Sequence, residues 1–212
     1  MLKKVFLVRH AQSEEDVDPN VRNSAHDTRI SITSVGKQQV VQLVDAMTPK
    51  IGDYQRVKII TSPSTRADQT TFLFCSRFPT VTFDVVHEEC IRNLNWGNVD
   101  ETTMKEVEQE RYRVGVLYFQ FPGGDDTPKF VKKIEEFVAR LLQDGLQHDH
   151  PKCVIIFTHG FALRVIAKAF LSMSDEEFRY LSNPPNCYVA TINITQSGID
   201  LEEPLPRIKF KI

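Results

Sequence analysis

Short apolar runs that end in polar residues recur along the chain and predict buried β-strands. Between them, apolar residues recur with the period of an α-helix. One such segment places Val40, Leu43 and Met47 on one helical face behind the candidate caps Thr33 and Ser34. The predicted strands cover residues 4–8, 57–60, 81–86, 154–157 and 188–194.

A second amphipathic helix is predicted behind Thr127 as cap, with Pro128 at its first helical position. Further helices are expected at residues 64–74, from Gly160 onward, and at 175–181. Strands that alternate with helices predict one α/β domain over residues 1–212, a three-layer α/β/α sandwich around a mostly parallel sheet. A charged, aromatic segment at about residues 92–126 interrupts this alternation and predicts an inserted helical cap.

Composition narrows the class of protein. The 212 residues are 41% hydrophobic and 25% charged, which is typical of a folded globular chain. A net charge of −2 gives no general attraction to nucleic acid or anionic lipid, so we expect neither partner and look for a local anion pocket. The longest apolar runs fall far short of the ~20 residues that span a bilayer.

The start of the chain and its cysteines indicate a cytoplasmic location. The first apolar run is too short for a signal peptide, because the charged residue Arg9 follows it directly. The cysteines have neither metal-ligand spacing nor the density of a disulfide framework, and we predict that all of them are buried thiols. They are Cys75, Cys90, Cys153 and Cys187.

Polar residues follow three of the predicted strands. Arg9 and His10 end the first strand, and His159 comes directly after the strand at 154–157. Ligands of open α/β sheets bind beyond the carboxyl ends of the strands, so two histidines there indicate a site. Arg66 falls in the first turn of a predicted helix, where the helix dipole disfavours a cation. It either pairs with a carboxylate or faces a bound anion.

Several motifs, in order along the chain, resemble the histidine phosphatase superfamily and its phosphoglycerate-mutase-like phosphatase branch. The resemblance implies a metal-independent phosphatase that hydrolyses a phosphomonoester through a phosphohistidine, with no cofactor. His10 is then the nucleophile, and Arg9, Arg66 and His159 bind the phosphate. The substrate is expected to be a small-molecule phosphate ester or a phosphorylated protein, and the sequence leaves the oligomeric state open. The resemblance rests on residues 7–14 (LVRHAQSE), 27–39, 61–70, 90–98, 121–125 and 158–164.

Three positions depart from the family pattern. Ala11 stands for the glycine after the nucleophile, and Asp16 stands where the family has asparagine or a similar donor. Asn93 occupies the place of the glutamate that gives a proton to the leaving group. An amide cannot deliver that proton, and general acid catalysis is typically worth about 10²–10⁴-fold.

With asparagine at position 93, the proton for the leaving group has three possible explanations. Asp16 acts as the acid, because a nearby phosphate dianion raises a carboxyl pKa. Alternatively, Glu88 or Glu89 takes the role. In the third interpretation no acid exists, and the protein acts on good leaving groups or only binds a phosphorylated ligand. A phosphoglycerate-mutase-type phosphotransferase is a further alternative, disfavoured by Asn93.

Overall fold

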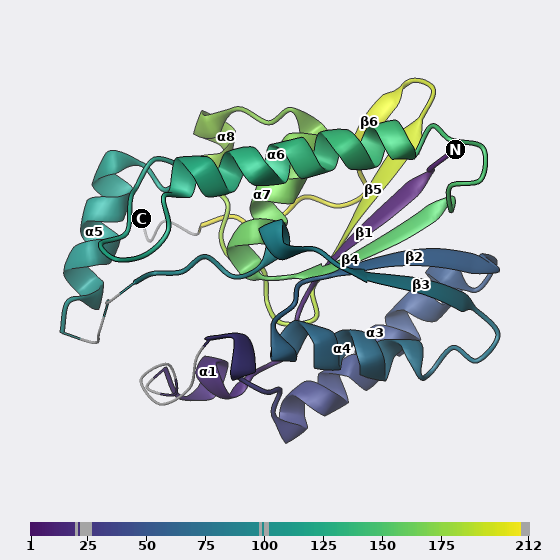
Figure 1. Ribbon diagram of the computed structural model, residues 1–212, viewed down its shortest axis with the longest axis horizontal. Coiled ribbons are helices and arrows are strands. Elements are labelled where there is room, and N and C mark those ends of the chain that lie inside the picture. The colour runs from purple at the N-terminus through teal and green to yellow at the C-terminus, as the bar shows by residue number, and fades with distance from the viewer. Residues whose placement is uncertain (20, 22–26, 98, 100–101, 209–212) are drawn as a thin grey trace.

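The computed structural model describes residues 1–19, 21, 27–97, 99 and 102–208 (Figure 1). Within these residues six strands form one sheet in the order β3-β2-β4-β1-β5-β6. The strands β1, β2, β3 and β4 are parallel, whereas β5 and β6 run antiparallel at one edge. The sheet is therefore mostly parallel, as predicted. The strands are β1 (Lys4–Arg9), β2 (Arg56–Thr61), β3 (Thr82–His87), β4 (Cys153–Thr158), β5 (Val189–Thr195) and β6 (Gly198–Leu201).

Helices cover both faces of the sheet, and the side chains of β1 show how. Phe6 and Val8 pack with the helices α3 and α4, whereas Val5 and Leu7 pack with α6 and α7. Alternate residues of a strand point to opposite faces, so one apolar run builds two cores. This confirms the three-layer arrangement. The helices are α1 (Glu14–Val17), α3 (Ser34–Ile51), α4 (Thr65–Cys75), α5 (Met104–Val114), α6 (Thr127–Asp144), α7 (Gly160–Leu171) and α8 (Asp175–Arg179), with short 3₁₀ turns at Asp27–Arg29 and Glu89–Ile91.

Element ends follow local capping chemistry. Thr33 caps α3, and its side chain accepts a hydrogen bond from the backbone N–H of Gly36. The predicted cap of α6 is wrong by one residue: Asp126 caps that helix by accepting from the N–H of Lys129, and Thr127 is its first residue. A carboxylate next to an exposed helix N-terminus also interacts favourably with the helix dipole. The strand β6 and the helix α1 were not predicted.

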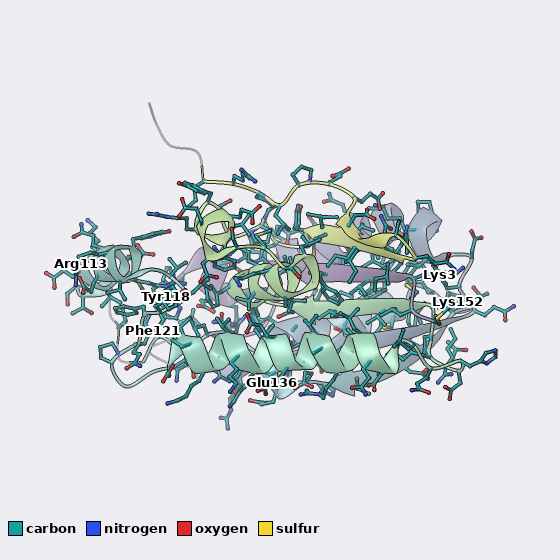
Figure 2. All side chains as sticks on the ribbon, turned by 90° about the horizontal axis from the view of Figure 1, so that it is seen from above. Lys3, Arg113, Tyr118, Phe121, Glu136 and Lys152 are labelled. Carbon is teal, nitrogen blue, oxygen red and sulfur yellow. The ribbon has the colours of Figure 1, made fainter. Side chains whose placement is uncertain are left out.

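The described residues of the segment 92–126 extend beyond one end of the sheet. Within the described part of this segment, α5 is the only helix, and the rest is turns, irregular backbone and an isolated bridge between Gln120 and Asp126. The predicted cap is therefore less helical than expected. Figure 1 shows α5 at the end of the sheet where α1 also lies. Figure 2 places Arg113 and Tyr118 at the end of the molecule opposite Lys3 and Lys152. The segment therefore lies at the carboxyl ends of the parallel strands.

An ion pair and a tight glycine contact join the two ends of this segment. The guanidinium of Arg92 donates two hydrogen bonds of 2.8 Å to the carboxylate of Asp125. Gly97 has a positive φ of 68°, and a Cβ there would come within 2.2 Å of the carbonyl oxygen of Pro122. Only glycine accommodates both requirements. These contacts close the segment into a loop whose base is fixed to the sheet domain.

Burial differs among the aromatic residues of the cap segment and among the cysteines. Phe119 and Phe121 are buried, but Tyr112 and Tyr118 are more than half exposed. All four cysteines are free thiols. Cys153 is buried, whereas the other three are only partly buried, which corrects that prediction. No helix in the described residues is long and apolar enough to span a membrane.

Candidate active site

The register of β1 against β4 brings the two histidines together. Arg9 pairs with Thr158 across the two parallel strands, and the N–H of His10 donates to the carbonyl oxygen of Thr158 at 2.9 Å. Because both histidines follow this pair directly, they leave the sheet side by side. Their ring centroids are 5.0 Å apart, and both side chains are buried.

A backbone carbonyl fixes the tautomer of His10. Nδ1 lies 2.8 Å from the carbonyl oxygen of Ala11. A carbonyl can only accept, so Nδ1 carries the proton and Nε2 keeps its lone pair. Burial, together with the positive charges of Arg66 and Arg9, lowers the pKa of His10 well below its usual value. The imidazole is therefore neutral at pH 7, which is the form that a nucleophile requires.

Arg66 reaches the same place from the neighbouring strand. The strand β2 ends at Thr61, and α4 begins four residues later with Ser64 as its cap. The side chain of Arg66 is only 1% exposed, and its Nη2 lies 3.6 Å from Oε2 of Glu15. Arg66 therefore pairs with a carboxylate, and it also lines the pocket described below. That it faces a bound anion stays a prediction.

Both terminal nitrogens of the Arg9 guanidinium donate hydrogen bonds. Nη1 donates to the carbonyl oxygen of Pro184 and Nη2 to Oδ1 of Asp16, each at 2.7 Å. Its Nε is buried and has no hydrogen-bond partner among the described residues. Burial lowers the pKa of Arg9, and the Asp16 carboxylate opposes that effect. The guanidinium is thus positioned in advance beside His10.

His159 is fixed by two serines that the sequence reasoning did not single out. Its Nε2 lies 3.0 Å from Oγ of Ser62 and 3.1 Å from Oγ of Ser64. Its Nδ1 is buried without a hydrogen-bond partner in the described part of the chain. Burial, and then the positive charge of Arg66, holds the pKa of His159 well below its usual value. The second histidine is therefore also neutral in the unliganded protein.

Asp16 is committed to hydrogen bonds that favour its ionised form. It receives bonds from the N–H and hydroxyl of Ser13, from Arg9 and from the amide of Asn186. Burial alone would raise the pKa of Asp16, but the hydrogen bonds from Ser13 and the positive charge of Arg9 oppose it, and the pKa lies below its usual value. A proton donor needs the opposite shift, so this geometry argues against Asp16 as the acid.

The other two carboxylates predicted as donors lie elsewhere. Glu88 accepts a hydrogen bond from the N–H of Cys90 and lies 3.7 Å from Arg140. The side chain of Glu89 is 76% exposed and lies 3.7 Å from Arg92. Neither residue lines the pocket. The structure therefore does not bring Glu88 or Glu89 to the histidines.

The converging side chains line a small pocket of about 150 Å³. That is well below the roughly 300–1,000 Å³ of pockets that bury drug-sized ligands, and it suits a compact ligand. Sequence reasoning found Arg9, His10, Asp16, Arg66, Asn93 and His159, all of which line it. It missed the other lining residues, which are Glu15, Trp96, Arg111, Gly160, Phe161, Arg164 and Asn183.

Two of the missed residues are buried arginines, Arg111 on α5 and Arg164 on α7. The guanidinium of Arg111 lies 5.2 Å from the ring centroids of Trp96 and Phe161. Its Nε is buried without a hydrogen-bond partner among the described residues. Arg164 donates to the carbonyl oxygen of Leu181 at 2.8 Å, and burial lowers its pKa to about 10. No periodic pattern or strand end marks either arginine in the sequence.

The pocket has more guanidinium groups than carboxylates among its lining residues. Its lining includes Arg9, Arg66, Arg111 and Arg164, against the two carboxylates of Glu15 and Asp16. Cations are rarely buried without partners, so an excess of guanidinium groups in one pocket indicates an anionic ligand. The described residues contain no group of three or more His, Cys, Asp or Glu side chains that could hold a metal ion.

Comparison with known proteins decides the family. The model of the histidine phosphatase superfamily, branch 1, matches residues 5–204. The chain belongs to this superfamily. A phosphoglycerate mutase-like protein, AT74 of Arabidopsis thaliana, is 26% identical over 92% of the chain, which spans 66% of that protein. The 5''-phosphoribostamycin phosphatase of Niallia circulans is 26% identical over 82% of the chain and 81% of its own length.

Solved structures show the same fold in this superfamily. A mycobacterial glucosyl-3-phosphoglycerate phosphatase, solved with VO3, superposes with a TM-score of 0.75. The match covers 96% of this chain and 99% of that one at 15% identity. A putative alpha-ribazole-5'-P phosphatase from Escherichia coli matches with a TM-score of 0.72 over 98% and 97% of the two chains, also at 15% identity.

Proposed function

We propose that this histidine phosphatase superfamily member hydrolyses a small phosphate monoester by transferring the phosphoryl group to Nε2 of His10. The observation that carries the proposal is the unprotonated Nε2 of a neutral, buried imidazole in one pocket with Arg9, Arg66 and His159. The phosphatases among the relatives support it. Substrates of small size fit the small volume of the pocket.

The chemistry follows from the charges that phosphoryl transfer develops. The transition state spreads negative charge over three equatorial oxygens, so catalysis depends on positioning and electrostatic stabilisation. Arg9 and Arg66 supply guanidinium donors beside His10, and His159 supplies a ring nitrogen. Because Arg9 is already held by Pro184 and Asp16, it needs little reorganisation when the phosphate arrives. Water then attacks the phosphohistidine and releases inorganic phosphate.

The test is hydrolysis of para-nitrophenyl phosphate by the purified chain in the presence of EDTA. We expect steady turnover that the chelator does not reduce, with competitive inhibition by vanadate. A protein that only holds a phosphorylated ligand would bind vanadate without releasing nitrophenol, and that result would refute the proposal. Turnover that EDTA abolishes would refute its metal-independent form.

The cap side of the pocket favours a substrate with a second anionic group. Arg111 has no carboxylate partner within ion-pair distance among the described residues, yet it is 93% buried in the unliganded protein. Its face packs on aromatic rings, which leaves the guanidinium edge as the donor. A carboxylate or a second phosphate on the substrate would satisfy it.

Arg111→Met tests this substrate class because it keeps most of the apolar packing and removes the charge. Phosphoglycolate carries a carboxylate, and ethyl phosphate is its matched analogue without one. We expect KM for phosphoglycolate to rise at least about tenfold, from the loss of one charge-assisted hydrogen bond. The KM for ethyl phosphate should change less than about twofold. Equal changes for both substrates would show that Arg111 only supports the pocket wall.

A further inference from the structure

The pocket contains a second carboxylate besides that of Asp16. Glu15 lies on α1, its side chain is 10% exposed, and it lines the pocket with His10 and Asn93. Its Oε2 is 3.6 Å from Nη2 of Arg66, a separation that is too long for a direct hydrogen bond. The carboxylate therefore lies beside the arginine that would hold the phosphate.

The other candidates for the acid are excluded by their chemistry or by their positions. Asn93 lies in the pocket but carries an amide. Asp16 accepts hydrogen bonds from Ser13, Arg9 and Asn186, which hold it ionised. Glu88 and Glu89 do not line the pocket. Among the described residues, Glu15 is the one remaining carboxyl group in the pocket.

We propose that Glu15 is the general acid and base of the reaction, in the role that Asn93 cannot perform. This rests on the proposed function, since it names a further catalytic residue of the same site. The phosphate monoester has a second pKa near 6, so the substrate brings a proton into the pocket when it binds as the monoanion. Glu15, the carboxylate that lies beside Arg66 in the pocket, takes that proton and holds it for the leaving oxygen.

Each proton and electron pair in the two steps is accounted for. In the first, the lone pair on Nε2 of His10 forms a bond to phosphorus while the ester P–O bond breaks. The leaving oxygen keeps that electron pair and takes the proton from Glu15, so an alcohol departs. In the second, the Glu15 carboxylate takes a proton from water, whose oxygen attacks phosphorus. The P–N bond breaks, its electrons return to Nε2, and inorganic phosphate leaves.

A structural role for Glu15 predicts different kinetics. If Glu15 only orients Arg66, its loss slows every substrate alike, since all of them carry the same phosphate. If it donates the proton, its loss matters most for alkyl phosphates, whose leaving oxygen must be protonated. Aryl phosphates expel a stable phenolate and need little help. The ratio of alkyl to aryl turnover therefore separates the two roles.

The experiment compares Glu15→Gln with wild type on glycerol 2-phosphate and para-nitrophenyl phosphate. We expect kcat for the alkyl ester to fall by about 10²-fold or more and kcat for the aryl ester by less than about fivefold. The matched control is Glu14→Gln, the neighbouring glutamate on α1, which is exposed and does not line the pocket. It should leave both rates unchanged. Equal losses on both esters, or no loss, would overturn the assignment.

A second substitution tests whether a carboxyl group at position 93 can replace that of Glu15. Asn93→Glu, made in the Glu15→Gln protein, places a carboxyl group back in the pocket and should restore most of the alkyl activity. In the wild-type protein it should add less than about threefold, since an acid is already present. An increase of about 10²-fold there would show that wild type lacks an acid and would overturn the assignment. If wild type hydrolyses neither ester, the proposed function itself fails.

Asp16→Asn provides the direct contrast with the adjacent carboxylate. It loosens Arg9 without removing a proton donor, so both esters should slow by similar factors. A selective loss of alkyl turnover in Asp16→Asn would identify Asp16 as the acid and overturn the assignment to Glu15.

Discussion

Replacing His10 with alanine should lower kcat for para-nitrophenyl phosphate by at least about 10³-fold. The substitution removes the attacking atom itself, which no adjustment of the remaining arginines replaces. Those arginines should still bind the ligand, so the Kd for vanadate should rise far less than kcat falls. Initial rates and vanadate titration of the same preparation measure both quantities.

His87→Ala is the matched control, because it removes an imidazole from the exposed end of β3. The ring of His87 is 55% exposed and lies 2.9 Å from Asp68, outside the pocket. This variant should hydrolyse the aryl ester at the wild-type rate. A His10→Ala protein that keeps more than a tenth of the wild-type kcat would contradict the assignment of the nucleophile.

The neutral state of the His10 imidazole can be tested by its pH dependence. Its folded-state pKa is lowered, so the neutral form persists as pH falls through the usual value of about 6.5. In the unliganded protein, the imidazole NMR signals of His10 should stay those of the neutral ring from pH 7 to about 5. A titration midpoint near 6.5 would show that the ring is neither buried nor surrounded by positive charge as described.

Replacing Arg66 with lysine should lower kcat by about 10²–10³-fold, the usual cost of removing one preorganised donor from a charged transition state. Lysine keeps the positive charge beside Glu15, so the buried carboxylate is not left alone. It lacks the planar fork that can bond two phosphate oxygens at once. The loss therefore reports geometry rather than net charge.

Arg113→Lys controls for the exchange of arginine for lysine on an exposed helix. Arg113 pairs with Glu110 on α5, and its side chain is 74% exposed. Steady-state rates of both variants, with denaturant unfolding to compare their stabilities, provide the measurement. Equal activity of Arg66→Lys and wild type, with unchanged unfolding, would remove Arg66 from the catalytic group.

Most helices and strands could be predicted from the sequence because they are long and have regular patterns of apolar residues. The β1 run from Val5 to Val8 alternates between two cores, and such runs predict buried strands well. The edge strand β6 has only four residues, none of them fully buried, so it contains no buried apolar run of this kind. The helix α1 has four residues, too few for a hydrophobic period.

The site was predictable wherever a strand end positions the residue. His10 and His159 follow paired residues of β1 and β4, and Arg66 opens the helix after β2. The residues that were missed reach the pocket by tertiary contacts. Arg111 comes from the last turn of α5, and nothing local in the chain shows that the cap directs it toward the sheet.

A capping pattern could have located Glu15. Ser13 and Asp16 form a serine-x-x-acid sequence, and the Asp16 carboxylate accepts hydrogen bonds from the N–H and hydroxyl of Ser13. That pattern predicts a helix start immediately after the strand that ends in His10. It also explains why Asp16 acts as a hydrogen-bond acceptor at the start of α1.

The most direct test of the account is to trap the phosphoryl enzyme. Wild-type protein mixed with para-nitrophenyl phosphate and quenched in alkali, which preserves phosphohistidine, should yield a phosphorylated peptide. Fragmentation by mass spectrometry should place the phosphoryl group on His10, and the same peptide from His10→Ala should be unmodified. A phosphoryl group on any other side chain would contradict the account, as would inversion of configuration at phosphorus, the signature of direct attack by water.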